Sequence, residues 1–132
     1  MDFDTRVDRA VAAADRGDYT TATDVVIDLI SEDWNNAEAH RAWGLVLLAQ
    51  DKATDAVSAF RTAMQIDPRR SDLHFDLARA LLGEAEQNPY LPLANWIETR
   101  ETVLEGLRRS PGDKDGLKLL NHVEQHKRRV TA

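Results

Sequence analysis

The chain has 132 residues, a length suited to one domain, and its 23 acidic and 17 basic side chains give a formal charge of −6. That charge has the wrong sign for a protein that neutralises phosphates, so we expect no nucleic-acid partner. The lack of cysteine excludes disulfides and cysteine-ligated zinc. A charged N-terminal segment and the lack of 18 consecutive apolar residues predict a cytoplasmic protein without a signal peptide or membrane insertion.

Apolar residues recur at three- and four-residue spacing along most of the chain. Val7, Ala10, Val11 and Ala14 show this spacing, whereas the alternation typical of strands is missing. Glycine, proline, asparagine and aspartate separate the periodic segments. The pattern predicts an all-α protein with about seven helices, over residues 3–16, 19–31, 37–50, 53–66, 71–86, 93–109 and 113–128.

The helices repeat with a period of 34 residues. At this offset Ala10 corresponds to Gly44 and Ala22 corresponds to Ala56, and the next unit begins at Ser71. Such a period is typical of stacked helix-turn-helix repeats.

The middle unit carries a set of residues at characteristic places: Trp43, Gly44, Leu47, Ala56, Phe60, Ala63 and Pro68. This set resembles the tetratricopeptide repeat, which implies a right-handed solenoid of helix pairs. Gly44 and Ala56 occupy places where two helices of a pair cross closely. We expect Phe60 to fill the gap between one helix pair and the next.

The resemblance extends over nearly the whole chain. We predict a single domain over residues 1–132, with repeats at about 3–36, 37–70 and 71–112, an insertion near 83–95 and a capping helix at 113–129. The first repeat departs from the family pattern, because Arg9 holds a large apolar place and Trp34 stands where proline is usual. In the capping helix, Leu117, Leu120 and Val123 are expected to face the core.

The resemblance also implies a function, since such repeats usually bind a peptide or helix of a partner protein in a concave groove. We therefore expect a non-enzymatic interaction module, an adaptor or scaffold. The family's groove places hold Val7, Val11, Arg41, Leu45, Leu48, Phe75, Asp76 and Arg79. Apolar members would form the floor, and the two arginines would orient the partner by pairing with its carboxylates. Leu48 and Leu82 are equally compatible with the core between repeats.

Some family members clamp the C-terminal carboxylates of heat-shock chaperones with basic and amide side chains. The corresponding places here hold Val7, Val11, Ala42, Asp72 and Asp76, so we expect no binding of a chaperone tail. Two alternatives to an adaptor stay open. One is a small acidic chaperone for a secreted or assembling client, and the other is a self-assembling structural subunit, which would make self-association part of the function.

The insertion contains an aromatic residue flanked by prolines, Pro89-Tyr90-Leu91-Pro92. It predicts a lengthened turn that either displays Tyr90 and Trp96 to a partner or only fills space beside the helix. Catalytic patterns are missing, and no cofactor is expected. His122 and His126 share a helical face, but Glu124 is one place too late for a metalloprotease motif, so we expect no metal site.

Overall fold

The computed structural model describes residues 1–88 and 93–131, and the side chains of 1–88 and 95–125. These residues form α-helices and no strand, which confirms the predicted all-α fold. The helices are α1 (Phe3–Asp15), α2 (Tyr19–Glu32), α3 (Ala37–Ala49), α4 (Ala53–Ile66), α5 (Ser71–Gln87), α6 (Leu93–Arg109) and α7 (Lys114–Thr131). Every predicted boundary lies within three residues of the observed one.

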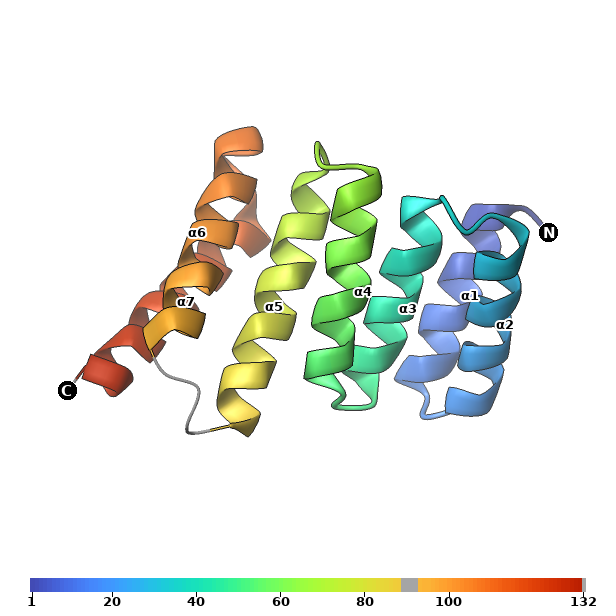
Figure 1. The fold of residues 1–132 in the computed structure, drawn as a ribbon, viewed down its shortest axis with the longest axis horizontal. Coiled ribbons are helices and arrows are strands. Elements are labelled where there is room, and N and C mark those ends of the chain that lie inside the picture. The colour runs from blue at the N-terminus through green and yellow to red at the C-terminus, as the bar shows by residue number, and fades with distance from the viewer. Residues whose placement is uncertain (89–92, 132) are drawn as a thin grey trace. The chain divides into compact units, whose positions relative to one another are not determined.

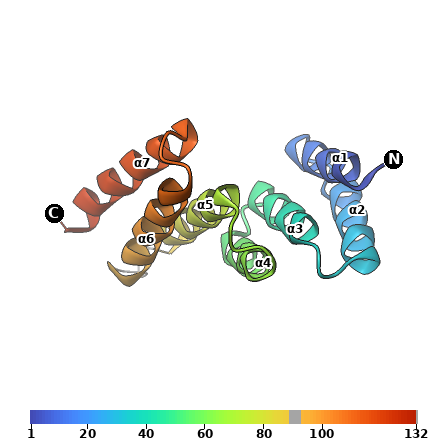
Figure 2. The same ribbon diagram turned by 90° about the horizontal axis from the view of Figure 1, so that it is seen from above.

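The helices group into two compact units, residues 1–68 and 69–132. In the first unit, α1 packs against α2 and α3, and α3 also packs against α2 and α4 (Figure 1). In the second unit, α5, α6 and α7 all pack against one another (Figure 2). We call them unit 1 and unit 2 and describe each by itself; the single domain over 1–132 stays a prediction.

Polar residues before three helices of unit 1, α1, α2 and α3, explain where those helices begin. The Asp2 carboxylate accepts a hydrogen bond from the Thr5 amide at 2.8 Å, and the Asp18 carboxylate accepts one from the Thr21 amide at 3.3 Å. The Asn36 side chain accepts from the Glu38 amide at 2.9 Å. Each bond satisfies an amide that has no partner within its helix, so short-range sequence fixes these starts.

Two left-handed residues end α1 and α3 in the same way. Gly17 has φ 83° and Asp51, 34 residues later, has φ 58°. After each, a backbone amide turns back to the helix, from Asp18 to the Ala13 carbonyl and from Lys52 to the Leu47 carbonyl, both at 2.9 Å. The turn geometry therefore repeats although aspartate replaces glycine, a substitution that the left-handed region tolerates in short polar residues.

Small residues form most of the core of unit 1, where alanines from α1, α2 and α3 surround Val26, Leu29 and Val46. At the α3–α4 crossing, a Cβ added to Gly44 would lie 2.5 Å from the Phe60 ring. Gly44 thus permits the close approach that the repeat pattern predicted. Phe60 fills this crossing within its own helix pair, and its role in the gap to the next pair stays a prediction.

Unit 2 has a core built around another aromatic ring. A Cβ added to Gly106 of α6 or to Gly116 of α7 would lie 2.6 Å from the Phe75 ring of α5. Around this contact pack further apolar residues: Leu82, Trp96, Val103, Leu107, Leu119 and Val123. Phe75 therefore joins all three helices of the unit.

The core face of α7 differs in part from the prediction. Leu119 and Val123 are buried and Leu120 packs against them, whereas Leu117 is 49% exposed. The expectation that Leu117 faces the core was wrong. Gly116, one residue earlier, takes the position against Phe75, and this places the neighbouring Leu117 side chain on the outer side of the helix.

Candidate functional site

In unit 1 the predicted groove residues lie on α1 and α3, which pack against each other. Val7 is buried, whereas Val11, Leu45 and Leu48 are half-buried. Arg41 precedes Leu45 by one turn on α3, and its guanidinium lies 3.6 Å from the Glu38 carboxylate. The partly open apolar residues and one cation thus share a stripe along α3, as the spacing predicted.

In unit 2 the predicted groove residues divide between core and surface. Phe75 is only 3% exposed, because it packs on Gly106 and Gly116, so it does not form an open groove floor. Asp76 is also buried, and its carboxylate accepts a hydrogen bond from Arg79 at 3.0 Å. This ion pair holds the Arg79 guanidinium at the surface of α5, where it is accessible to a partner.

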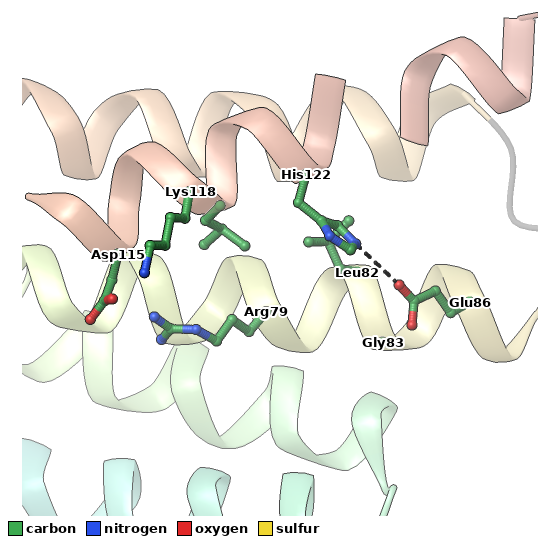
Figure 3. Close-up of a pocket in the computed structure, with 8 residues that line it drawn as sticks. Arg79, Leu82, Gly83, Glu86, Asp115, Lys118 and His122 are labelled. Atoms are coloured by element: carbon green, nitrogen blue, oxygen red, sulfur yellow. Dashed lines mark hydrogen bonds and ion pairs between the residues drawn. The ribbon is translucent and has the colours of Figure 1, made fainter. Parts of the chain in front are cut away.

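Arg79 lines a hollow between α5 and α7 of 440 Å³. We call it the α5–α7 hollow, lined by Arg79, Leu82, Gly83, Glu86, Asp115, Lys118, Leu119 and His122 (Figure 3). The volume lies within the range of small binding sites in proteins.

The α5–α7 hollow is polar at both ends. The Arg79, Lys118 and Asp115 side chains gather at one end, whereas His122 and Glu86 face each other at 3.4 Å at the other (Figure 3). Buried Leu82 and Leu119 belong to the apolar core below it. Such an arrangement can receive an apolar side chain and pair a neighbouring carboxylate with Arg79 or Lys118.

The four lining residues that come from α7 were missed from the sequence, because the last helix was treated only as a cap. Aligning Lys114, the first residue of α7, with Ser71, the first residue of α5, provides the missing signal. The groove places of α5 then correspond to four lining residues of α7: Asp115, Lys118, Leu119 and His122. The capping helix therefore presents groove residues in the same pattern as a repeat.

The insertion gave two candidates for a further contact. Tyr90 lies outside the described residues. Trp96 is 9% exposed, and its indole Nε1 donates a hydrogen bond to the Val123 carbonyl at 3.0 Å. Display of Trp96 to a partner was therefore the wrong alternative, because the indole ring is buried within the unit and its N–H already has a hydrogen-bond acceptor there.

The described histidine side chains of unit 2 contact a carboxylate or a backbone carbonyl. His122 pairs with Glu86, whereas the His126 side chain lies outside the described part. Buried His74 contacts the Arg70 carbonyl through Nδ1 at 2.9 Å. Among the described residues no three histidines or carboxylates converge as a metal site would require. No helix among those residues is sufficiently long and apolar to cross a membrane.

Comparison with known proteins gives a repeat match over part of the chain and a fold. Residues 47–86 match the model of the tetratricopeptide repeat. No curated protein matches the chain. Among solved structures, the tetratricopeptide-repeat domain of Sgt2 from Aspergillus fumigatus is similar with a TM-score of 0.80 and 16% identity, covering 97% of this chain and 80% of that one.

Two domains of human RPAP3 are also similar. The first tetratricopeptide-repeat domain has a TM-score of 0.77 and 13% identity, and the match covers 91% of this chain and 87% of that one. The second, solved in complex with the HSP70 peptide SGPTIEEVD, has a TM-score of 0.74 and 18% identity, and covers 90% and 92%.

Fold and site thus define an all-helical protein built from tetratricopeptide-like helix pairs. The 34-residue pattern and the family match over residues 47–86 agree with this architecture. The chain therefore has the fold of a tetratricopeptide-repeat domain, and its residues 47–86 match the model of that repeat.

Proposed function

We propose that this chain is a non-enzymatic protein-interaction module that binds a peptide or helix of a partner at the α5–α7 hollow of unit 2. The observation that carries the proposal is the α5–α7 hollow, where Arg79 and Lys118 lie beside an apolar base. Tetratricopeptide-repeat domains of similar fold include one bound to a peptide, which supports a protein ligand here.

The hollow favours a partner segment that combines apolar and acidic side chains. An aliphatic side chain of the partner would contact Leu82 and Leu119. A carboxylate one turn away in a helical partner, or two residues away in an extended one, would pair with Arg79 or Lys118. The Arg79 guanidinium is already oriented by the buried Asp76 carboxylate, so little side-chain entropy is lost when it binds. We infer that this end of α5 and α7 sets the orientation of the partner.

The residues present do not suit the clamp by which related domains hold a chaperone tail. Val7 and Ala42 are buried, Asp76 is paired with Arg79, and Asp72 accepts from Arg70 at 2.6 Å. Acidic or buried residues at these places would repel or fail to reach a carboxylate-rich terminus. We therefore expect the peptide SGPTIEEVD, bound by the second RPAP3 domain, not to bind this chain with micromolar affinity in calorimetry.

The test of the interaction module uses two variants with the same change in charge. Arg79→Gln with Lys118→Glu alters the hollow, whereas Arg108→Gln with Lys114→Glu alters residues outside it; Arg108 is 70% exposed and Lys114 is exposed. Wild type and both variants, shown to be equally helical by circular dichroism, are used to capture proteins from source-cell lysate. Captured proteins are identified by mass spectrometry and remeasured by calorimetry with the purified partner.

A partner held by wild type and the control, and lost by the hollow variant, supports the proposal. Equal retention by both variants would show that the hollow is not the site. A chain that captures no protein, and forms only concentration-dependent oligomers in light scattering, would contradict the adaptor and favour the self-assembling alternative.

A further inference from the structure

Besides the α5–α7 hollow of unit 2, the structure has a hollow in unit 1 that the proposed function does not use. This α2–α4 hollow has a volume of 520 Å³ and lies over α3, from which His40, Trp43 and Leu47 line it. Ile30 of α2 forms one side, and Asp55 and Thr62 of α4 are on the other. One wall is therefore aliphatic and the opposite wall is polar and acidic, with an indole between them.

Two large apolar side chains are exposed near Ile30, one within α2 and one just after its end. Ile27, one turn before Ile30, is 53% exposed, and Trp34, just after the end of α2, is 72% exposed. The backbone of Trp34 is fixed against the hollow, because His40 Nε2 donates a hydrogen bond to its carbonyl at 2.6 Å. Exposed tryptophan and isoleucine beside a hollow are typical of an interface, since such side chains gain most from burial against a partner.

The charge of unit 1 decides what kind of partner fits. Residues 1–68 carry thirteen acidic and six basic side chains, a formal charge of −7, whereas residues 69–132 carry ten acidic and eleven basic side chains, a formal charge of +1. The net charge of the chain therefore comes from unit 1. Asp55 lies in the lining of the hollow, and on α2 exposed Asp24 precedes Ile27 by one turn. These charges attract a cationic segment and repel an acidic one.

We propose that the α2–α4 hollow, together with Ile27 and Trp34, binds a cationic amphipathic helix of a protein partner. The apolar stripe of that helix contacts Trp43, Leu47 and Ile30, with Trp34 and Ile27 closing over its edge. Its lysines or arginines pair with Asp55 and Asp24 along the two rims. The site shares no residue with the α5–α7 hollow, so the module would hold two partner segments of different charge.

The experiment uses the full ¹⁵N-labelled chain and synthetic peptides. The probe is a helical peptide of about 14 residues made only of leucine and lysine with one apolar stripe, and its counterpart has glutamate in place of lysine. The three tryptophans report by region, since Trp43 lines the α2–α4 hollow, the Trp34 carbonyl bonds to the lining residue His40, and Trp96 is buried in unit 2. We expect the lysine peptide to shift the indole signals of Trp34 and Trp43, to leave Trp96 unchanged, and to bind more weakly as salt is raised.

A matched pair of variants tests the contact. Ile27→Ser with Trp34→Ser removes two exposed apolar side chains of unit 1, and we expect Kd for the lysine peptide, followed on Trp43, to rise at least about tenfold. Leu117→Ser with Ile97→Ser removes two side chains of similar exposure, 49% and 47%, from unit 2, and should change Kd less than about twofold. Circular dichroism confirms that both variants keep their helices.

Several results would overturn the proposal. Equal binding of the glutamate peptide, shifts confined to Trp96, or equal weakening in both variants would each place the peptide elsewhere. Dimerisation of the chain that Ile27→Ser with Trp34→Ser abolishes would show that a second copy, and not a cationic partner, covers the surface. The α5–α7 variant, Arg79→Gln with Lys118→Glu, should bind the lysine peptide as wild type does, so failure here is separable from failure of the proposed function.

Discussion

Both units bring helices close together through a contact between an aromatic ring and a glycine, but the helix that carries the ring differs between them. In unit 1 the ring comes from the second helix of the pair, with Phe60 of α4 on Gly44 of α3. In unit 2 it comes from the first helix, with Phe75 of α5 on Gly106 of α6 and Gly116 of α7. The comparison shows that close packing depends on a matched ring and glycine, and that either helix can supply the ring.

The rings have different consequences for the faces around them. Phe60 leaves the α3 stripe of Arg41, Leu45 and Leu48 partly open. Phe75 holds α7 against α5, and the line where these two helices meet carries the α5–α7 hollow. Because Phe75 packs on α7 as well as on α6, residues of the capping helix line a candidate binding site.

Removing either ring should have the largest effect. Phe60→Ala and Phe75→Ala each leave a cavity around a deeply buried ring, and we expect each to lower the free energy of unfolding by about 3–5 kcal/mol. Denaturant unfolding followed by circular dichroism measures this. Leu117→Ala, at a 49% exposed position, should cost less than about 0.5 kcal/mol. A cost below about 1 kcal/mol for either phenylalanine would contradict the role of its ring.

Adding a methyl group at the glycines should have an intermediate effect. Gly44→Ala and Gly106→Ala place a Cβ 2.5 and 2.6 Å from a ring, and we expect each to cost about 1–3 kcal/mol despite the better helix propensity of alanine. Gly112→Ala is the control, because no atom lies within 4 Å of its added Cβ, and it should change stability by less than about 0.5 kcal/mol.

A double variant separates the ring contact from any other effect of the methyl group. In a Phe60→Leu background the side chain at position 60 is smaller, so Gly44→Ala should cost less than it does beside phenylalanine. Strict additivity of the two changes would show that the ring is not what excludes a side chain at position 44.

The smallest expected effect is on stability at acidic pH, and it comes from the aspartates that cap α1 and α2. Hydrogen bonds from Thr21 hold the pKa of the Asp18 carboxyl below its ordinary value, and Thr5 lowers the pKa of Asp2 in the same way. A carboxyl with a lowered folded-state pKa stabilises the protein above its unfolded pKa, and this stabilisation is lost as the pH falls through the folded value.

Asp18→Asn tests this contribution, because asparagine keeps the capping acceptor and cannot titrate. We expect the melting temperature of the variant to fall less than that of wild type between about pH 5 and pH 3. Parallel losses in the two proteins would contradict the contribution of Asp18.

The sequence by itself determined the features that depend on short stretches of chain. Helix limits follow from caps such as Asp2 and Asp18 and from the left-handed residue Gly17, and all of these act within a few residues. The close helix approach at Gly44 was also predicted, because Gly44 holds a small-residue place in a pattern that recurs every 34 residues, but its contact with the Phe60 ring was not.

Only the tertiary structure decided which residues of unit 2 line the candidate site. From the sequence, Phe75 and Trp96 could lie equally well at the surface or in the core. Both are buried because α7 packs on them, with Gly116 against Phe75 and the Val123 carbonyl bonded to Trp96. Helical spacing shows which residues share a stripe, but it does not show which neighbour covers that stripe. That choice rests on contacts between distant helices, and for this reason the α5–α7 hollow became visible only in the folded chain.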